Sequence, residues 1–147
     1  MQQRTLEVLL VDDDPGDVDL ILEVLQDTQM GLQPQIVHDG VEAMAYLRRE
    51  GPYSRAVRPD LILLDLNMPR KDGREVLRDI RQDPLLHTIL VVVLTTSESP
   101  TDIDTAYKLG ANCYVTKPVG LEQFTEMIRR FQDFWLTVVQ YPSRSTP

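Results

Sequence analysis

The chain has 147 residues, 42% of them hydrophobic, and a formal net charge of −8 at pH 7. This length suits one hydrophobic core and is short for two domains, and the acidic balance argues against a nucleic-acid partner because no basic patch is available to neutralise phosphates. No apolar run approaches the ~18 residues of a membrane span, and no signal segment is visible, so we expect a soluble protein with no membrane partner. The single cysteine, Cys113, cannot form an intramolecular disulfide and suits a reducing cytoplasm, where we expect the protein to act.

Five short apolar runs, each followed by a helical pattern, are typical of buried parallel strands. The predicted strands are residues 6–11, 35–37, 61–64, 89–94 and 113–115. The predicted helices are one that opens near Pro15, then 40–49, one from Gly73 to just before Pro84, 100–110 and 121–139. Either Asp14 or Asp17 caps the first of these helices, and residues 51–59 form a long loop. Right-handed crossovers between parallel strands then put helices on both faces of the sheet, which makes one α/β domain.

Polar side chains follow four of the predicted strands. Asp12 and Asp13 follow the first strand, Asp65 the third, Thr95 the fourth and Lys117 the fifth. Ligands bind outside the carboxyl ends of strands in such sheets. Carboxylates are the hard oxygen donors that Mg²⁺ prefers, and a hydroxyl and a lysine suit phosphoryl oxygens. A carboxylate between Mg²⁺ and lysine can attack a phosphoryl donor and form an aspartyl-phosphate.

Each of these motifs has a plainer interpretation when it is taken alone. The acidic run 12–17 is as well explained by a turn and a helix cap as by a metal site. The run 95–97 is typical of a polar turn, and 67–73 of a loop. The order of complementary groups at four strand ends is what favours one shared phosphoryl site.

This joint pattern resembles the receiver domain of two-component response regulators over residues 5–140. The residues that carry the resemblance are the acidic pair Asp12-Asp13, Asp65 in Leu-Asp-Leu-Asn-Met-Pro, Asp72-Gly73, Thr95, Tyr114 and Lys117-Pro118. The resemblance implies a flavodoxin-like (CheY-like) sheet of five parallel strands in the order 2-1-3-4-5, with helices on both faces. The departure from the family pattern is Leu90, where many receivers begin the fourth strand with proline.

The resemblance also implies roles for the acidic residues. Asp65 would accept a phosphoryl group from the phosphohistidine of a histidine kinase. Asp13 and Asp65 would bind Mg²⁺ through their carboxylates, Asn67 through its backbone carbonyl, and Asp12 through a water molecule. Only slow loss of the protein's own phosphate is expected, so the chain would be a phosphoacceptor and not an enzyme.

Three further residues would respond to phosphorylation, as the resemblance implies. Lys117 would pair with the phosphoryl group, and the Lys117–Pro118 peptide would be cis. Thr95 would move to bond a phosphoryl oxygen, and Tyr114 would turn inward with it, so that one added charged group biases a two-state element. A plainer alternative for Tyr114 is an ordinary packing role.

A narrower resemblance concerns three segments of the chain. Residues 58–77, 111–119 and 133–139, together with the long loop before residue 61, resemble the small single-domain regulators paired with cyanobacterial phytochromes. The resemblance implies that the phosphoryl donor is a light-regulated histidine kinase of the phytochrome type.

The last predicted helix has an apolar face wider than one sheet face needs. Its core-facing stripe is Leu121, Phe124, Ile128, Phe131, Trp135 and Val138, with Met127, Phe134 and Val139 beside it. We expect a homodimer through this helix, with Tyr107 and Lys108 of the fourth helix and the edge strand adding to the contact. The predicted interface residues are Tyr107, Phe124, Met127, Phe131, Phe134, Trp135 and Val138. The plainer alternative is that the extra apolar residues cover neighbouring elements of the same chain.

No output domain is expected, because residues 141–147 resemble a tail, so signalling would occur through altered protein contacts. Two other functions stay open. One is a phosphorylation-independent scaffold with a receiver fold. The other is a Mg²⁺-dependent hydrolase that works through an aspartyl-phosphate. Asn67 weighs against the hydrolase, because that position would need a carboxylic acid to donate a proton.

Overall fold

The computed structural model describes residues 6–26 and 34–143. Within these residues, five parallel strands form one sheet in the order β2-β1-β3-β4-β5, which confirms the predicted fold. The strands are β1 (Val8–Val11), β2 (Gln35–Val37), β3 (Leu61–Leu64), β4 (Leu90–Thr95) and β5 (Cys113–Thr116). The order reverses between β1 and β3, which lie side by side at the centre of the chemistry described below.

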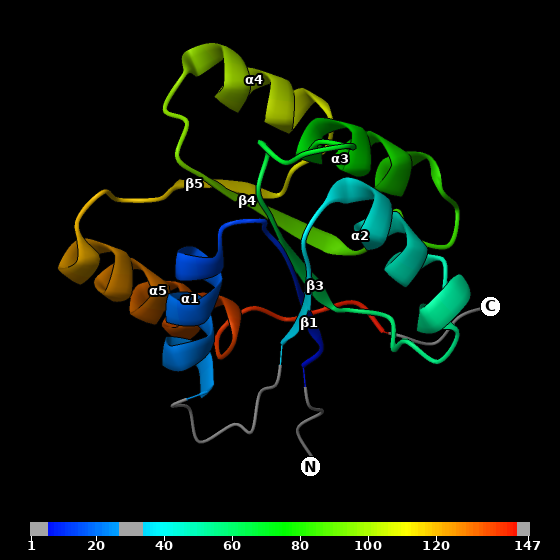
Figure 1. Ribbon diagram of the computed structural model, residues 1–147, viewed down its shortest axis with the longest axis horizontal. Coiled ribbons are helices and arrows are strands. Elements are labelled where there is room, and N and C mark those ends of the chain that lie inside the picture. The colour runs from blue at the N-terminus through cyan, green and yellow to red at the C-terminus, as the bar shows by residue number, and fades with distance from the viewer. Residues whose placement is uncertain (1–5, 27–33, 144–147) are drawn as a thin grey trace.

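Helices cover both faces of the sheet, as Figure 1 shows. They are α1 (Pro15–Gln26), α2 (Gly40–Leu47), α3 (Gly73–Gln82), α4 (Pro100–Lys108) and α5 (Leu121–Trp135), with a short 3₁₀ helix η1 (Gly51–Tyr53). The helices α1 and α5 share one face, and α2, α3 and α4 share the other. Helices therefore lie on both faces of the sheet, as predicted.

Alternating side chains of the central strands supply the cores on both faces. In β1, Val8 and Leu10 join the core beneath α1 and α5, whereas Leu9 and Val11 join the core beneath α2 and α3. All four are at most 2% exposed. A strand that is buried on both faces must be apolar at every position, which explains its uninterrupted apolar sequence.

Acidic and hydroxyl residues begin several helices by accepting backbone hydrogen bonds. The Asp17 N–H donates to Asp14 Oδ1 at 3.1 Å, so Asp14, and not Asp17, caps α1. Asp39, Asp72 and Ser99 cap α2, α3 and α4 in the same way. The cap at Asp14 leaves the Asp17 carboxylate available for a different contact.

The structure differs from the sequence prediction at the end of the last helix. This helix ends at Trp135 and not at residue 139, because Leu136 becomes its C-cap and is buried with 3% exposure. Tyr141, predicted to begin a tail, packs against the core beneath α1 and α5 and donates a hydrogen bond to the Trp135 carbonyl. Smaller differences are the end of α2 at Leu47 and the η1 turn inside the predicted loop.

Candidate functional site

The carboxyl ends of β1, β3, β4 and β5 bring the predicted polar residues together. Lys117 Nζ lies 2.7 Å from Asp12 Oδ2 and 3.5 Å from Asp65 Oδ2. The Lys117 N–H donates to the Thr95 carbonyl at 2.7 Å, which ties the ends of β4 and β5 together. These contacts join residues that are up to 105 positions apart in the sequence. The predicted convergence of the strand ends is therefore present.

Lys117 is a buried cation held by carboxylates, and its side chain is only 3% exposed. Burial alone would lower the pKa of its ammonium. The hydrogen bond to Asp12 and the negative charge of Asp65 outweigh burial and raise that pKa above its usual 10.5. Lys117 therefore stays charged throughout the physiological pH range.

Asp12 is buried beside Lys117 and is only 1% exposed. Burial raises the pKa of its carboxyl above the usual 3.8, although hydrogen bonds from Lys117 and from the Asp14 backbone N–H partly offset the effect. The nearby Asp65 carboxylate raises it further. Extra positive charge at this site would thus stabilise the ionised form of Asp12.

Asp65 sits at the end of β3, where the following loop returns close to it. Its backbone N–H donates to the Val11 carbonyl at 3.0 Å, and its Oδ1 accepts from the Asn67 backbone N–H at 3.3 Å. The loop then passes so near that a Cβ added at Gly73 would lie 2.2 Å from the Asp65 carbonyl oxygen. Only glycine fits there, which fixes the start of α3 against the acidic residue.

The acidic residues have the chemistry and the spacing for a divalent cation. Asp12, Asp13 and Asp65 each offer one carboxylate oxygen, and these oxygens lie within 4.8 Å of one another. Asp13 is exposed, whereas the other two are buried. The exposed Asp13 leaves the cluster open to solvent on its side. Such a set of oxygen donors fits a hard cation that keeps part of its water shell.

Thr95 presents a buried hydroxyl beside these residues. The residue is fully buried, and its Oγ1 finds no hydrogen-bond partner within the described part of the chain. A buried hydroxyl without a partner is costly, typically ~1–3 kcal/mol. An oxygen atom that accepted a hydrogen bond from this hydroxyl would remove that cost.

Comparison with known families decides the identity of this arrangement. The family model described as the response regulator receiver domain matches residues 8–129. The chain belongs to the response-regulator receiver family. Its role is that of a receiver-domain signalling protein and not that of an enzyme in the ordinary sense.

The receiver domain is similar to regulators of phytochrome signalling. Response regulator Rcp1 of Synechocystis sp. is 46% identical over 136 residues, which are 92% of this chain and 92% of the relative. The crystal structure of the phosphorylated cyanobacterial phytochrome response regulator RcpA superposes with a TM-score of 0.92 and 48% identity, covering 95% of this chain and 100% of that one. The Mn²⁺-bound form of Rcp1 has a TM-score of 0.90, 45% identity, and coverage of 94% and 99%. The predicted resemblance to cyanobacterial phytochrome regulators is confirmed.

Tyr114 of the receiver domain is tied to the loop between β4 and α4. Its hydroxyl donates to the Ser97 carbonyl at 2.9 Å, and its backbone N–H donates to the Tyr107 hydroxyl at 3.1 Å. Ser97 in turn donates to Asp102, which accepts from Arg74 at 2.8 Å. Sequence analysis did not assign Ser97, Asp102 and Arg74 to this network, because their contacts depend on how α3, α4 and the loop after β4 pack together.

Asp17 is a further residue of the site that sequence analysis did not assign to it. Its Oδ2 lies 2.9 Å from Lys117 Nζ, so the lysine contacts a third carboxylate. The Lys117–Pro118 peptide also differs from expectation, because it is trans. Trans is the form that X–Pro bonds favour by default, and here the backbone contact from Lys117 to Thr95 is made without isomerisation.

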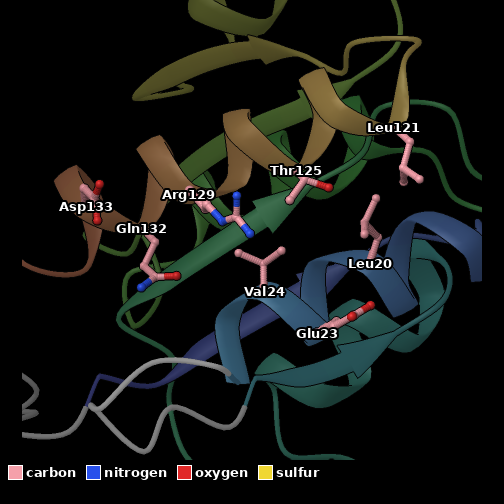
Figure 2. Close-up of a pocket in the computed structure, with 8 residues that line it drawn as sticks. All are labelled: Leu20, Glu23, Val24, Leu121, Thr125, Arg129, Gln132 and Asp133. Atoms are coloured by element: carbon pink, nitrogen blue, oxygen red, sulfur yellow. The ribbon is translucent and has the colours of Figure 1, made fainter.

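A separate groove of about 560 Å³ lies between α1 and α5 and shares no residue with the acidic site. Figure 2 shows Leu20 and Val24 of α1 facing Thr125 and Arg129 of α5 across it. Leu121, predicted to face the core, instead lines the mouth of this groove and is 69% exposed. Leu121 is the first residue of α5, and the helix leaves its side chain open to solvent there.

The predicted dimer residues divide into one buried, three half-buried and three exposed side chains. Phe124 is 4% exposed in the chain's own core, so it is not available to a partner and the prediction fails there. Met127, Phe131 and Trp135 are half-buried against the same core, as the plainer alternative expects. The exposed members, at 48–60% exposure, are Tyr107, Phe134 and Val138.

Within the described residues, no helix is both long enough and apolar enough to cross a membrane.

Proposed function

We propose that this receiver domain accepts a phosphoryl group on Asp65 and signals through the resulting change in its protein contacts. The contact of Lys117 with both Asp12 and Asp65 is the observation that carries the proposal, because it brings a buried cation to the carboxylate that would be modified. The free Thr95 hydroxyl supports it too, since it can bond a phosphoryl oxygen. Tyr114 would then leave Ser97 and turn inward.

The reaction is a transfer between a phosphohistidine and a carboxylate. One carboxylate oxygen of Asp65 attacks phosphorus, and the P–N bond breaks with its electron pair staying on the imidazole nitrogen. Asp13 and Asp65 would hold Mg²⁺ directly, Asn67 through its backbone carbonyl, and Asp12 through water. The bound ion would neutralise charge on the transferring oxygens. Lys117, which contacts Asp65, would also balance charge on these oxygens, and only slow hydrolysis of the product is expected.

The test is incubation with Mg²⁺ and acetyl phosphate, followed by intact mass measurement. We expect the wild-type chain to gain one phosphoryl group and Asp65→Asn to gain none, because an amide is not a nucleophile of this kind. Asp104→Asn, a change at an exposed position of α4, is the matched control and should label normally. Full labelling of Asp65→Asn would move the acceptor elsewhere. A folded wild-type chain that takes no phosphate would favour a scaffold, and repeated turnover of phosphate esters would favour a hydrolase.

We propose that the natural donor is a histidine kinase of the phytochrome type. The similarity to the phytochrome response regulators RcpA and Rcp1 supports this donor. The same labelling assay can be run with a phosphorylated phytochrome kinase in place of acetyl phosphate. Faster transfer from that kinase than from an unrelated histidine kinase is the expected result, and equal rates would contradict it.

We propose further that two copies pair through the C-terminal end of α5. Phe134 is 51% exposed and lies edge-on to Trp135, with ring centroids 5.6 Å apart, and Phe131 stacks on the same Trp135. An exposed aromatic ring that continues a packed cluster is typical of the centre of an interface. Tyr107 and Val138 would lie at its edge.

Phe134→Asp is expected to make the protein monomeric at concentrations where the wild-type chain sediments as a dimer. A charge in a buried interface without a partner costs several kcal/mol. Sedimentation velocity measures the change, and Val41→Asp, at another exposed apolar position with 46% exposure, is the control. A folded Phe134→Asp protein with unchanged sedimentation would refute the assignment.

A further inference from the structure

The Lys117 ammonium is held by one more carboxylate than the phosphoryl site requires. Its Nζ lies 2.7 Å from Asp12, 2.9 Å from Asp17 and 3.5 Å from Asp65. Asp12 and Asp65 belong to the cluster that can bind a cation, and Asp17 does not. Among the described residues, the ion pair of the Asp17 carboxylate is with Lys117.

Asp17 is well fixed for such a role. It lies in the first turn of α1, and its own backbone N–H is bound by the Asp14 cap. Its side chain is 26% exposed, whereas that of Lys117 is 3% exposed, so the contact joins a surface helix to a buried cation. Both residues line an open pocket of about 570 Å³ beside the strand ends.

The geometry of an ammonium group gives this third contact a consequence. The group has three N–H donors in fixed relative directions. Two short hydrogen bonds, to Asp12 and to Asp17, fix the orientation of the group and leave the third donor for Asp65. The 3.5 Å to Asp65 is long for a hydrogen bond, and an additional oxygen on Asp65 would shorten the gap.

We propose that Asp17 is a positioning residue for phosphoryl transfer, which acts by holding the Lys117 ammonium toward the oxygen that arrives on Asp65. The inference rests on the proposed function of Asp65. Without Asp17, the ammonium would turn freely between Asp12 and Asp65, and its charge would be placed less well for the transferring group. Asp17 itself touches neither the donor nor the reacting atoms.

The test compares initial rates of phosphoryl incorporation from acetyl phosphate at saturating Mg²⁺. Asp17→Asn should lower the maximal rate about tenfold, while the acetyl phosphate concentration at half-maximal rate changes less than about twofold. Asp17→Glu, which can still reach the lysine, should recover most of the rate. Asp19→Asn removes the same charge from an exposed position of the same helix and should behave as wild type.

A second set of variants separates positioning from a general structural role. In a Lys117→Met background, Asp17→Asn should change the remaining rate less than about twofold, because the residue acts only through the lysine. If Asp17→Asn lowered the rate as much in that background as in the wild-type chain, the proposal would be overturned. It would also be overturned if Asp17→Asn alone labelled as fast as Asp19→Asn. If Lys117→Met does not fold, the rates of Asp17→Asn, Asp17→Glu and Asp19→Asn decide the question by themselves.

The same experiment keeps the two claims apart. Wild-type labelling that is lost in Asp65→Asn upholds the proposed function whatever Asp17→Asn does. Labelling of Asp17→Asn at the wild-type rate then overturns only the role of Asp17. No labelling of a folded wild-type chain would overturn both.

Discussion

Lys117→Ala is expected to lower the free energy of unfolding by about 3 kcal/mol in the absence of Mg²⁺, because it leaves buried carboxylates without their cation. Lys117 is the partner of Asp12, Asp17 and Asp65. Urea unfolding measures the loss. Lys108→Ala, at an exposed position in the last turn of α4, removes the same side chain and should change stability by less than about 0.5 kcal/mol.

The loss should depend on pH and on the cation. The pKa of Asp12 is already raised in the folded protein, and without Lys117 it should rise further. Folded Asp12 then binds a proton more tightly than unfolded Asp12, so stability falls as pH rises through the raised pKa. The deficit of the variant should therefore shrink as pH is lowered from 7 toward that pKa.

Mg²⁺ should stabilise Lys117→Ala more than it stabilises the wild-type chain, because the ion would replace the missing positive charge. An unfolding free energy equal to that of the wild type at pH 7 without Mg²⁺ would contradict the account. So would a deficit that grows on acidification, since protonation of Asp12 relieves the repulsion.

Gly73→Ala is expected to destabilise the domain by about 1–3 kcal/mol and to slow phosphoryl incorporation at least tenfold. The new Cβ would lie 2.2 Å from the Asp65 carbonyl oxygen and 2.8 Å from Leu66 Cα, so backbone must move. The displacement would act on the residue proposed to accept phosphate. Thermal unfolding and the initial labelling rate measure the two effects.

Gly16→Ala is the matched control for this substitution. Its Cβ would lie at an ordinary 3.4 Å from Asp14 Oδ1, in the first turn of a helix. Alanine is favoured over glycine in helices by about 1 kcal/mol at most, so the control should be neutral or slightly stabilising. Equal behaviour of the two variants would show that the contact of Gly73 with the Asp65 backbone is unimportant.

Much of the fold could be predicted from the sequence because its strands are buried on both faces. An apolar run such as Leu61–Leu64 has no other good setting in a chain of this size. The polar residue after each run then marks the strand end, so the sequence alone predicts that Asp12, Asp65 and Lys117 lie together. The apolar runs and the polar residues that follow them are enough to predict these strands and their ends.

Contacts between distant side chains could not be predicted in this way. The sequence leaves the cap of the first helix open between Asp14 and Asp17, and only the cap at Asp14 leaves the Asp17 side chain available to reach Lys117. The pair Arg74 and Asp102 likewise depends on how α3 and α4 pack. The last helix was predicted too long because apolar spacing continues past Trp135, whereas burial of Leu136 ends it.

Chemical trapping of the phosphorylated product shows directly whether Asp65 accepts the phosphoryl group. The protein is treated with Mg²⁺ and acetyl phosphate and then with borohydride, which reduces an acyl phosphate on aspartate to homoserine. Peptide mass mapping should find homoserine at position 65 and at no other aspartate. Homoserine at position 12 or 13, or none in a protein that remains folded, would show that Asp65 is not the acceptor.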